Sequence, residues 1–185
     1  MYRVTMSHDM ENTLALLQQL PSAVDALLRS LPDFWTRNNE GGETYSPFVV
    51  VAHLIHAERM DWIPRVKCIL EHGESRELPR FDRDPDEAER LTKSLPQLLD
   101  EFAELRAKNI EQLRSLNLQP ADLARRGRHP RFGVVTLSQL LATWAAHDLT
   151  HLHQISRTMA YQYREAVGPW TAFLGVMHCN GHSEA

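Results

Sequence analysis

Cysteines and long apolar runs are both scarce in this chain. The only two cysteines, Cys68 and Cys179, lie far apart in the sequence, so no disulfide framework can be read from them. The longest apolar runs, such as PFVVVA, are much shorter than the roughly 20 residues that a membrane-spanning helix needs. The opening residues, MYRVTMSHDMENT, lack the apolar core of a signal peptide. We therefore expect a soluble, cytoplasmic protein with no membrane partner.

The chain also lacks a strong excess of either charge. Its 20 basic and 24 acidic residues give a formal net charge of −4, so no overall basic field favours nucleic acid, and we expect no nucleic-acid partner. One local cluster of arginines, in the segment 125–131, is either an anion site or a solvated loop. With 185 residues, 43% of them hydrophobic, the chain can bury a core without staples, which predicts one domain over residues 1–185.

Apolar residues recur with helical spacing through most of the chain. A first stripe covers residues 10–31, and Pro21 is expected to break or restart that helix. Ser46 is a suitable N-cap for a second helix, which runs over residues 47–71 with a kink expected at Pro64. A long charged loop is expected to follow.

Two further helices and a short tail complete the pattern. The third helix is predicted over residues 85–116, with a bend at Pro96. After a connector that holds at most short strands, Thr136 and Gln139 form the capping box of a fourth helix. Gly168-Pro169 ends this unit and begins a short C-terminal helix. The predicted fold is all-α, a four-helix bundle with two long connectors and a short C-terminal helix.

The stretch AAHDLTHLHQ carries three histidines on the predicted fourth helix. His147 and His151 lie four residues apart and continue the apolar stripe between Trp144 and Ile155. Both imidazoles therefore occupy positions where a core residue is expected, and burying them is costly unless their nitrogens are satisfied. A divalent metal such as Zn, Ni or Fe satisfies them directly. Because histidine pairs at this spacing also occur without metal, a solvated cluster is the alternative.

Two neighbours of this pair are expected to have other roles. His153 lies about 240° round the helix from His147, which predicts a surface position. Asp148 is angularly offset from the pair and suits an indirect or surface role. Because position 148 is Asp, the chain lacks the glutamate of the zinc protease motif HExxH, and a protease is not expected.

A third ligand has to come from another helix, and VVVAHLIHAERMDW offers the best one. His53 shares a stripe with Val50, Ala57 and Met60, and the small Ala57 allows another helix to approach closely. His56 lies about 60° off this stripe and is a possible substitute. Glu58 is also off the stripe and suits a structural or indirect role. The remaining histidines are expected in loops or termini: His8, His72, His129, His178 and His182.

The segments SPFVVVAHLIHAERMDW, TLSQLLATWAAHDLTHLHQISR and YREAVGPW together resemble the DinB-like superfamily of four-helix-bundle metalloproteins. The resemblance extends from about residue 20 to the C-terminus. It implies an up-down-down-up bundle with a long crossover connection. It also implies that one divalent metal ion is bound by His53, His147 and His151.

The function that this resemblance implies is less specific than the fold. The superfamily includes mycothiol- and bacillithiol-dependent enzymes and metal-dependent hydrolases, and homodimers are common in it. For this chain it implies a small-molecule substrate, a low-molecular-weight thiol as cosubstrate if the reaction is thiol transfer, and a homodimer.

Three neutral ligands leave the metal charge and a coordination position available, which favours a catalytic site. A non-catalytic metal- or ligand-binding bundle is the alternative. Supporting roles fall to Glu58, Asp61, Asp148 and Gln154, which the sequence does not rank. The connector 116–135, with its arginines, is expected to cover the mouth of the site.

Overall fold

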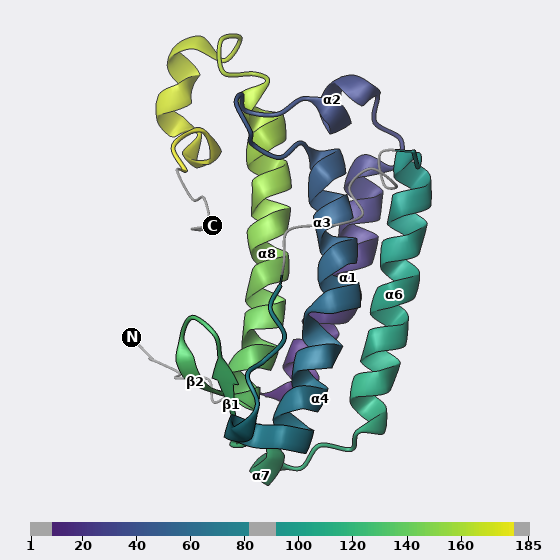
Figure 1. Cartoon of the computed structure of the whole chain (residues 1–185). Coiled ribbons are helices and arrows are strands. Elements are labelled where there is room, and N and C mark those ends of the chain that lie inside the picture. The colour runs from purple at the N-terminus through teal and green to yellow at the C-terminus, as the bar shows by residue number, and fades with distance from the viewer. Residues whose placement is uncertain (1–8, 82–91, 180–185) are drawn as a thin grey trace.

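Four long helical segments form a bundle in the computed structural model, which describes residues 9–81 and 92–179 (Figure 1). They are α1 (Met10–Leu28), α3 (Pro47–Met60) continued by α4 (Trp62–His72), α6 (Leu95–Ser115) and α8 (Leu137–Tyr161). Short α2 (Asp33–Arg37) precedes α3. The predicted all-α bundle is confirmed. None of the described helices has the length and apolar character needed to cross a membrane.

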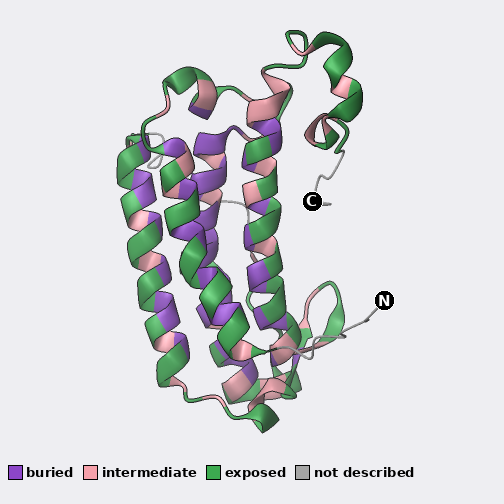
Figure 2. Ribbon diagram, turned by 180° about the vertical axis from the view of Figure 1, so that it is seen from behind, coloured by how far each residue is buried: buried purple, intermediate pink, exposed green. Residues whose placement is uncertain are grey.

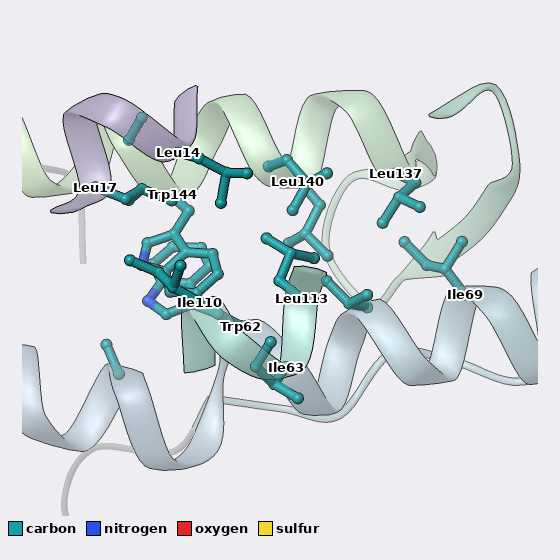
Figure 3. Close-up of a cluster of buried hydrophobic side chains, with 14 of the residues drawn as sticks. Leu14, Leu17, Trp62, Ile63, Ile69, Ile110, Leu113, Leu137, Leu140 and Trp144 are labelled. Carbon is teal, nitrogen blue, oxygen red and sulfur yellow. The ribbon is translucent and has the colours of Figure 1, made fainter. Parts of the chain in front are cut away.

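The direction of each helix follows from the two core clusters at opposite ends of the bundle. One cluster, shown in Figure 3, contains Leu14 near the start of α1, Leu137 at the start of α8, and Leu113 near the end of α6. The other contains Leu28 at the end of α1 and Leu95 at the start of α6. Thus α1 and α8 are parallel, and α3–α4 and α6 run the opposite way. This is the predicted up-down-down-up order, with the crossover between α4 and α6.

Hydroxyl N-caps mark where three of the long helices begin. The backbone N–H groups of Val49 and Gln139 donate to the side-chain oxygens of Ser46 and Thr136, as predicted for α3 and α8. The third helix was expected to begin near Pro85, but α6 begins at Leu95, after residues 92–94 that are not helical. The segment 82–91 lies outside the described residues. Pro96 stands in the first turn of α6, where it causes no bend.

Pro21 does not break α1, contrary to the prediction. The helix is continuous over its 19 residues with Pro21 buried inside it. A proline has no N–H for the carbonyl four residues earlier, which here belongs to Leu17. The oxygen of Leu17 accepts a hydrogen bond of 2.8 Å from Nη1 of Arg106 on α6. The carbonyl that proline leaves without its helical donor is therefore satisfied by another helix.

The second predicted helix is divided in two, and the break is not at Pro64. Helix α3 ends at Met60, Asp61 lies between the helices, and α4 begins at Trp62. The ring of a proline conflicts with the carbonyl four residues earlier, which here is that of Met60. The interruption therefore appears one turn before the proline.

The connector after α6 forms a short helix and a hairpin. Helix α7 (Pro120–Leu123) leads into strands β1 (Arg126–His129) and β2 (Gly133–Thr136), which pair antiparallel. A Cβ on Gly127 would lie 2.7 Å from Cγ1 of Ile69, so only glycine lets this hairpin pack against α4. At the C-terminus, the predicted short helix is instead two 3-10 segments, η2 (Gly168–Phe173) and η3 (Gly175–Met177).

A buried arginine joins all four bundle helices. Arg106 of α6 is 1% exposed and donates to Leu17 of α1, to Asp148 of α8 at 2.6 and 3.1 Å, and to Glu58 of α3 at 2.8 Å. Glu58 also accepts hydrogen bonds from Trp144 at 3.0 Å and from the side chain of Asn109. Burial opposes the charge on Arg106, but the two carboxylates raise its pKa above the ordinary value.

Replacing this arginine is expected to be strongly destabilising. Arg106→Met leaves two buried carboxylates without their cation, and breaking a buried ion pair from one side costs about 3–5 kcal/mol. Urea unfolding followed by circular dichroism measures this loss. Lys108→Met, at an exposed position of the same helix, is the control and should change the free energy of unfolding by less than about 0.5 kcal/mol. Equal losses in the two variants would contradict a central role for Arg106.

Candidate metal centre

Three histidine side chains converge between α3 and α8. Nε2 of His147 lies 3.3 Å from Nε2 of His53 and 3.1 Å from Nε2 of His151. The three ligand atoms all lie within 4.8 Å of one another. Two nitrogens bound to one zinc ion at the tetrahedral angle are about 3.3 Å apart. The spacing of these nitrogens therefore fits one ion held by all three rings.

The helical faces bring the rings together as the sequence pattern predicts, but only His151 is buried, and His53 and His147 are half-buried. On α8, Trp144 and Ile155 are fully buried and His151 is 8% exposed, whereas His153 lies on the exposed side. On α3, Val50 and Ala57 of the predicted stripe are buried, whereas Met60 is 52% exposed, because the stripe turns outward at the end of the helix. The apolar stripes thus bring histidines from two helices to one point, although His53 and His147 are 94 residues apart.

A neighbouring amide determines which nitrogen of His151 is available. Nδ1 of His151 lies 2.8 Å from Oε1 of Gln154, an acceptor, so Nδ1 carries the proton and Nε2 keeps its lone pair. Burial and the nearby His147 lower the pKa of His151 to about 4. This ring is therefore neutral at neutral pH, which is the form that binds a metal.

A family model of the DinB superfamily matches residues 16–155, a range that includes all three histidines. The chain belongs to the DinB superfamily.

Two solved structures share the fold of this DinB-superfamily protein. YfiT from Bacillus subtilis, described as a probable metal-dependent hydrolase with an unusual four-helix bundle topology, aligns with a TM-score of 0.68 and 18% identity. The alignment covers 90% of this chain and 93% of YfiT. TT2238, a four-helix bundle protein, aligns with a TM-score of 0.56 and 21% identity over 80% of this chain and 98% of its own. Comparison with curated proteins gave no significant match.

Several other predicted residues of the DinB-superfamily chain lie outside the histidine group. His56 is buried and packs against Phe81, with ring centroids 4.8 Å apart, so it does not replace His53. Glu58 has the structural role expected of it, as a partner of Arg106. Asp148 is also held by Arg106 and is 1% exposed, which excludes the surface role considered for it.

Gln154 and Asp61 are the other two residues for which a supporting role at the histidine group was predicted, and their contacts differ. Gln154 bonds directly to a histidine of the group. Asp61 is buried at the break between α3 and α4, where its Oδ1 lies 2.6 Å from Nε of Arg65. Burial raises the pKa of Asp61, while Arg65, His147 and His56 oppose that rise. Asp61 is therefore paired with Arg65, one turn further along the chain.

The histidines outside the group are only partly in loops. His72 is the last residue of α4 and His129 lies in β1, contrary to the prediction of loop positions. His178 is exposed after the last 3-10 segment, as expected. His8 and His182 lie outside the described residues.

Aromatic side chains that the sequence reasoning missed surround the histidine group. Phe81 meets His53 edge-on with ring centroids 5.7 Å apart, and Tyr45 lies 6.0 Å from the same ring. Trp62 lies 5.1 Å from His147 and stacks on Trp144 at 5.5 Å. These four residues come from four separate segments, and no local motif connects them.

The segment that reaches the site is the connector after α4, not the predicted connector 116–135. In Figure 1 the chain after α4 rises between α3 and α8, and its Phe81 packs against the rings of His53 and His56. In the same connector, the N–H of Leu78 donates to the carbonyl of Arg128 at 2.8 Å. Arg125 donates to the carbonyl of Leu70, and Arg126 pairs with Glu74 at 3.0 Å. These two arginines hold the hairpin on α4 and its following turn.

The lowered pKa of His151 predicts an acid sensitivity of the metal-free protein. In the unfolded chain this histidine titrates near 6.5, so between pH 6.5 and 4 protons bind the unfolded state more readily. The contribution of His151 to the free energy of unfolding is therefore fully present above pH 6.5. It falls by about 3 kcal/mol as the pH decreases from 6.5 to 4. Urea unfolding across this range should show the loss in the wild type and a smaller one in His151→Gln. Identical pH slopes would contradict the assignment.

Proposed function

We propose that His53, His147 and His151 bind one divalent metal ion through their Nε2 atoms, and that the protein is a metal-dependent enzyme acting on a small molecule. The observation that carries this proposal is the convergence of three Nε2 atoms, at 3.1 and 3.3 Å, in a half-buried, aromatic-lined position. Buried imidazoles require partners, and a metal supplies one to all three together. Zn, Ni and Fe all accept imidazole ligands.

The composition of the ligand group favours catalysis over a structural role. Structural zinc sites use four protein ligands, whereas catalytic sites use three and leave a position open. The carboxylate of Asp148, whose Oδ1 lies 3.9 Å from Nδ1 of His147, is committed to Arg106, so the histidine group is neutral. When bound, a divalent ion would supply Lewis acidity for activating a nucleophile.

The chain's own residues prepare the site in distinct ways. Gln154 orients His151, and Phe81 and Tyr45 cover His53 with aromatic surface. Trp62 is 2% exposed, and its Nε1–H has no hydrogen-bond partner among residues 9–81 and 92–179. The stacked Trp144 instead donates to Glu58. A buried hydrogen-bond donor is normally paired with an acceptor. Because the ring of Trp62 lies beside that of His147, we propose that its N–H donates to an oxygen atom of a bound substrate.

Hydrolysis is the reaction we propose, because YfiT, which shares the fold, is described as a probable metal-dependent hydrolase. Transfer of a low-molecular-weight thiol is a second candidate, since a cation with only neutral ligands also stabilises a thiolate. The alternative to an enzyme is a non-catalytic bundle that binds a metal or a small ligand. We also propose a reducing, cytoplasmic location, consistent with the unpaired Cys68 and Cys179.

Metal occupancy tests the ligand set. Elemental analysis of protein loaded with zinc should show about one ion per chain. Replacing any of His53, His147 or His151 with Ala should reduce occupancy at least tenfold, because each change removes one of only three ligands. His153→Ala, on the exposed side of the same helix, should retain full occupancy. An equal loss in His153→Ala would show that the site is elsewhere.

A substrate panel tests the reaction. Protein loaded with Zn, Ni or Fe is assayed on small esters and amides, with and without an added low-molecular-weight thiol. Hydrolysis should proceed without thiol and fall at least 100-fold in His147→Ala, with His153→Ala unaffected. A product that carries the mass of the thiol would identify transfer instead. Full metal binding without turnover of any substrate would favour the non-catalytic bundle.

A further inference from the structure

A cavity outside the histidine group lies at the end of α8. Three segments enclose it: residues 157–164 at and just after the end of α8, the loop 38–46 between α2 and α3, and the C-terminal segment 171–179, which Figure 1 shows beside the end of α8. Its volume is about 370 Å³, within the range of about 300–1,000 Å³ typical of small-molecule sites. None of the three histidines of the group lines it. We call it the C-terminal cavity.

The outer wall of this cavity is loosely packed on the bundle. Between Gln162 and Cys179 no residue is buried, and Figure 2 shows this part of the chain as exposed or half-buried throughout. Its large apolar side chains, Trp170 and Phe173, are 69% and 81% exposed and do not line the cavity. The space beneath the segment is therefore not filled by the segment's own bulky residues.

The inner wall is fixed by a buried ion pair. Arg157 of α8 is 5% exposed, and its Nε and Nη2 donate to Oε1 and Oε2 of Glu40, both at 2.8 Å. The side chain of Gln162 also donates to the carbonyl of Asn39 at 3.0 Å. A bidentate pair of this kind fixes the geometry of both partners, so the loop 38–46 is held against α8. The cavity is thus preformed, and a ligand would bind there without the cost of ordering these two segments.

A second arginine gives the cavity one excess positive charge. Arg164 and Tyr161 both line it, and Cζ of Arg164 lies 4.4 Å from the centroid of the Tyr161 ring. The carboxylate of Glu165 is 3.6 Å from Arg164, but it is 89% exposed and does not line the cavity, so that ion pair is weak. Glu40 is the one carboxylate among the described lining residues, and it balances Arg157. The charge of Arg164 is therefore not balanced within the cavity.

The rest of the wall is apolar or has its polar groups already engaged. Val176 and Met177 are half-buried and line the cavity. The hydroxyl groups of Thr44 and Thr171 donate to carbonyls of their own segments, at 2.8 and 2.9 Å. The guanidinium of Arg164 is thus the main donor that the wall offers to a ligand.

A stacked guanidinium beside an apolar surface indicates one class of ligand. The planar fork of an arginine matches a carboxylate, and stacking on an aromatic ring leaves the N–H edge of that fork available. We propose that the C-terminal cavity is a second small-molecule site, which binds a monocarboxylate with a short apolar chain. The carboxylate pairs with Arg164, and the chain packs against Val176 and Met177.

The charge and the volume set the size of this ligand. One excess positive charge matches a monoanion better than a doubly charged phosphate. At about 30 Å³ for each non-hydrogen atom, as in liquid water, the cavity holds on the order of ten such atoms. Hexanoate has the required charge and a chain of suitable length, and it is the probe for this site.

Alkylation of Cys179 by iodoacetamide tests the proposal on the full chain loaded with zinc. Cys179 is exposed and lines the cavity, whereas Cys68 is buried and serves as the internal reference. Hexanoate should slow the alkylation of Cys179 at least fivefold, with a midpoint of about 1 mM, because the bound chain covers the thiol. The rate at Cys68 should not change. Mass spectrometry of the alkylated peptides measures both rates.

Matched variants and probes separate the charge from the apolar chain. Arg164→Gln removes the cation and should raise the midpoint for hexanoate at least tenfold. Arg114→Gln makes the same change at an exposed position of α6 and should leave the midpoint unchanged. Hexanamide has the same chain without the charge, and inorganic phosphate has charge without the chain. Each should require at least tenfold more than hexanoate for the same protection.

Four results would overturn the proposal. They are an unchanged rate at Cys179 in about 20 mM hexanoate, equal midpoints in the wild type and Arg164→Gln, equal protection by phosphate, and loss of protection in His147→Ala. The last result would show that hexanoate acts by binding the zinc ion. Zinc content should match the wild type in Arg164→Gln, because Arg164 is not part of the histidine group. A failure of this site is thereby distinguished from a failure of the proposed metal site.

Discussion

The guanidinium of Arg106 is the single group on which the bundle and its site both depend. It is buried among four helices and contacts a carbonyl of α1 and carboxylates of α3 and α8. A cation in such a position is stable only because its Nη1 and Nη2 groups meet negative or polar oxygens from three other helices. The same contacts orient the helices around it, since an error in the register of any helix would separate a donor from its acceptor.

The burial of Arg106 also determines which side chains are available at the neighbouring histidine group. Glu58 and Asp148 are the acidic residues closest in sequence to the histidine ligands on α3 and α8, and both are committed to Arg106. Without that partner, either carboxylate would compete for a divalent ion. The arginine therefore leaves the histidine group, which is the proposed metal site, composed of imidazoles alone. A neutral group leaves more positive charge on an ion than a group that contains carboxylates.

Much of this arrangement could be predicted from local patterns. The caps at Ser46 and Thr136 mark helix starts, because a hydroxyl N-cap is a local interaction. The stripe that contains His147 and His151 indicates a buried face, because the helical period is also local.

Interactions between distant segments could not be predicted in the same way. Arg106 follows Leu105 in an amphipathic pattern that makes it look like a surface residue, and its partners lie 42 to 89 residues away. The continuity of α1 through Pro21 depends on that same arginine. The aromatic residues around His53 also come from separate loops, so no spacing connects them.

The separation of the ligands along the chain affects how the protein matures. His53 lies 94 residues before His147, and α8 is the last of the four helices to leave the ribosome. A nascent chain can therefore present only one of the three imidazoles until the bundle is nearly complete. Closing so long a loop has an entropic cost that only the packed helices can offset. On the proposed function, metal capture is consequently a late event in folding, and an ion that binds only the finished site would shift the equilibrium towards chains that have already folded.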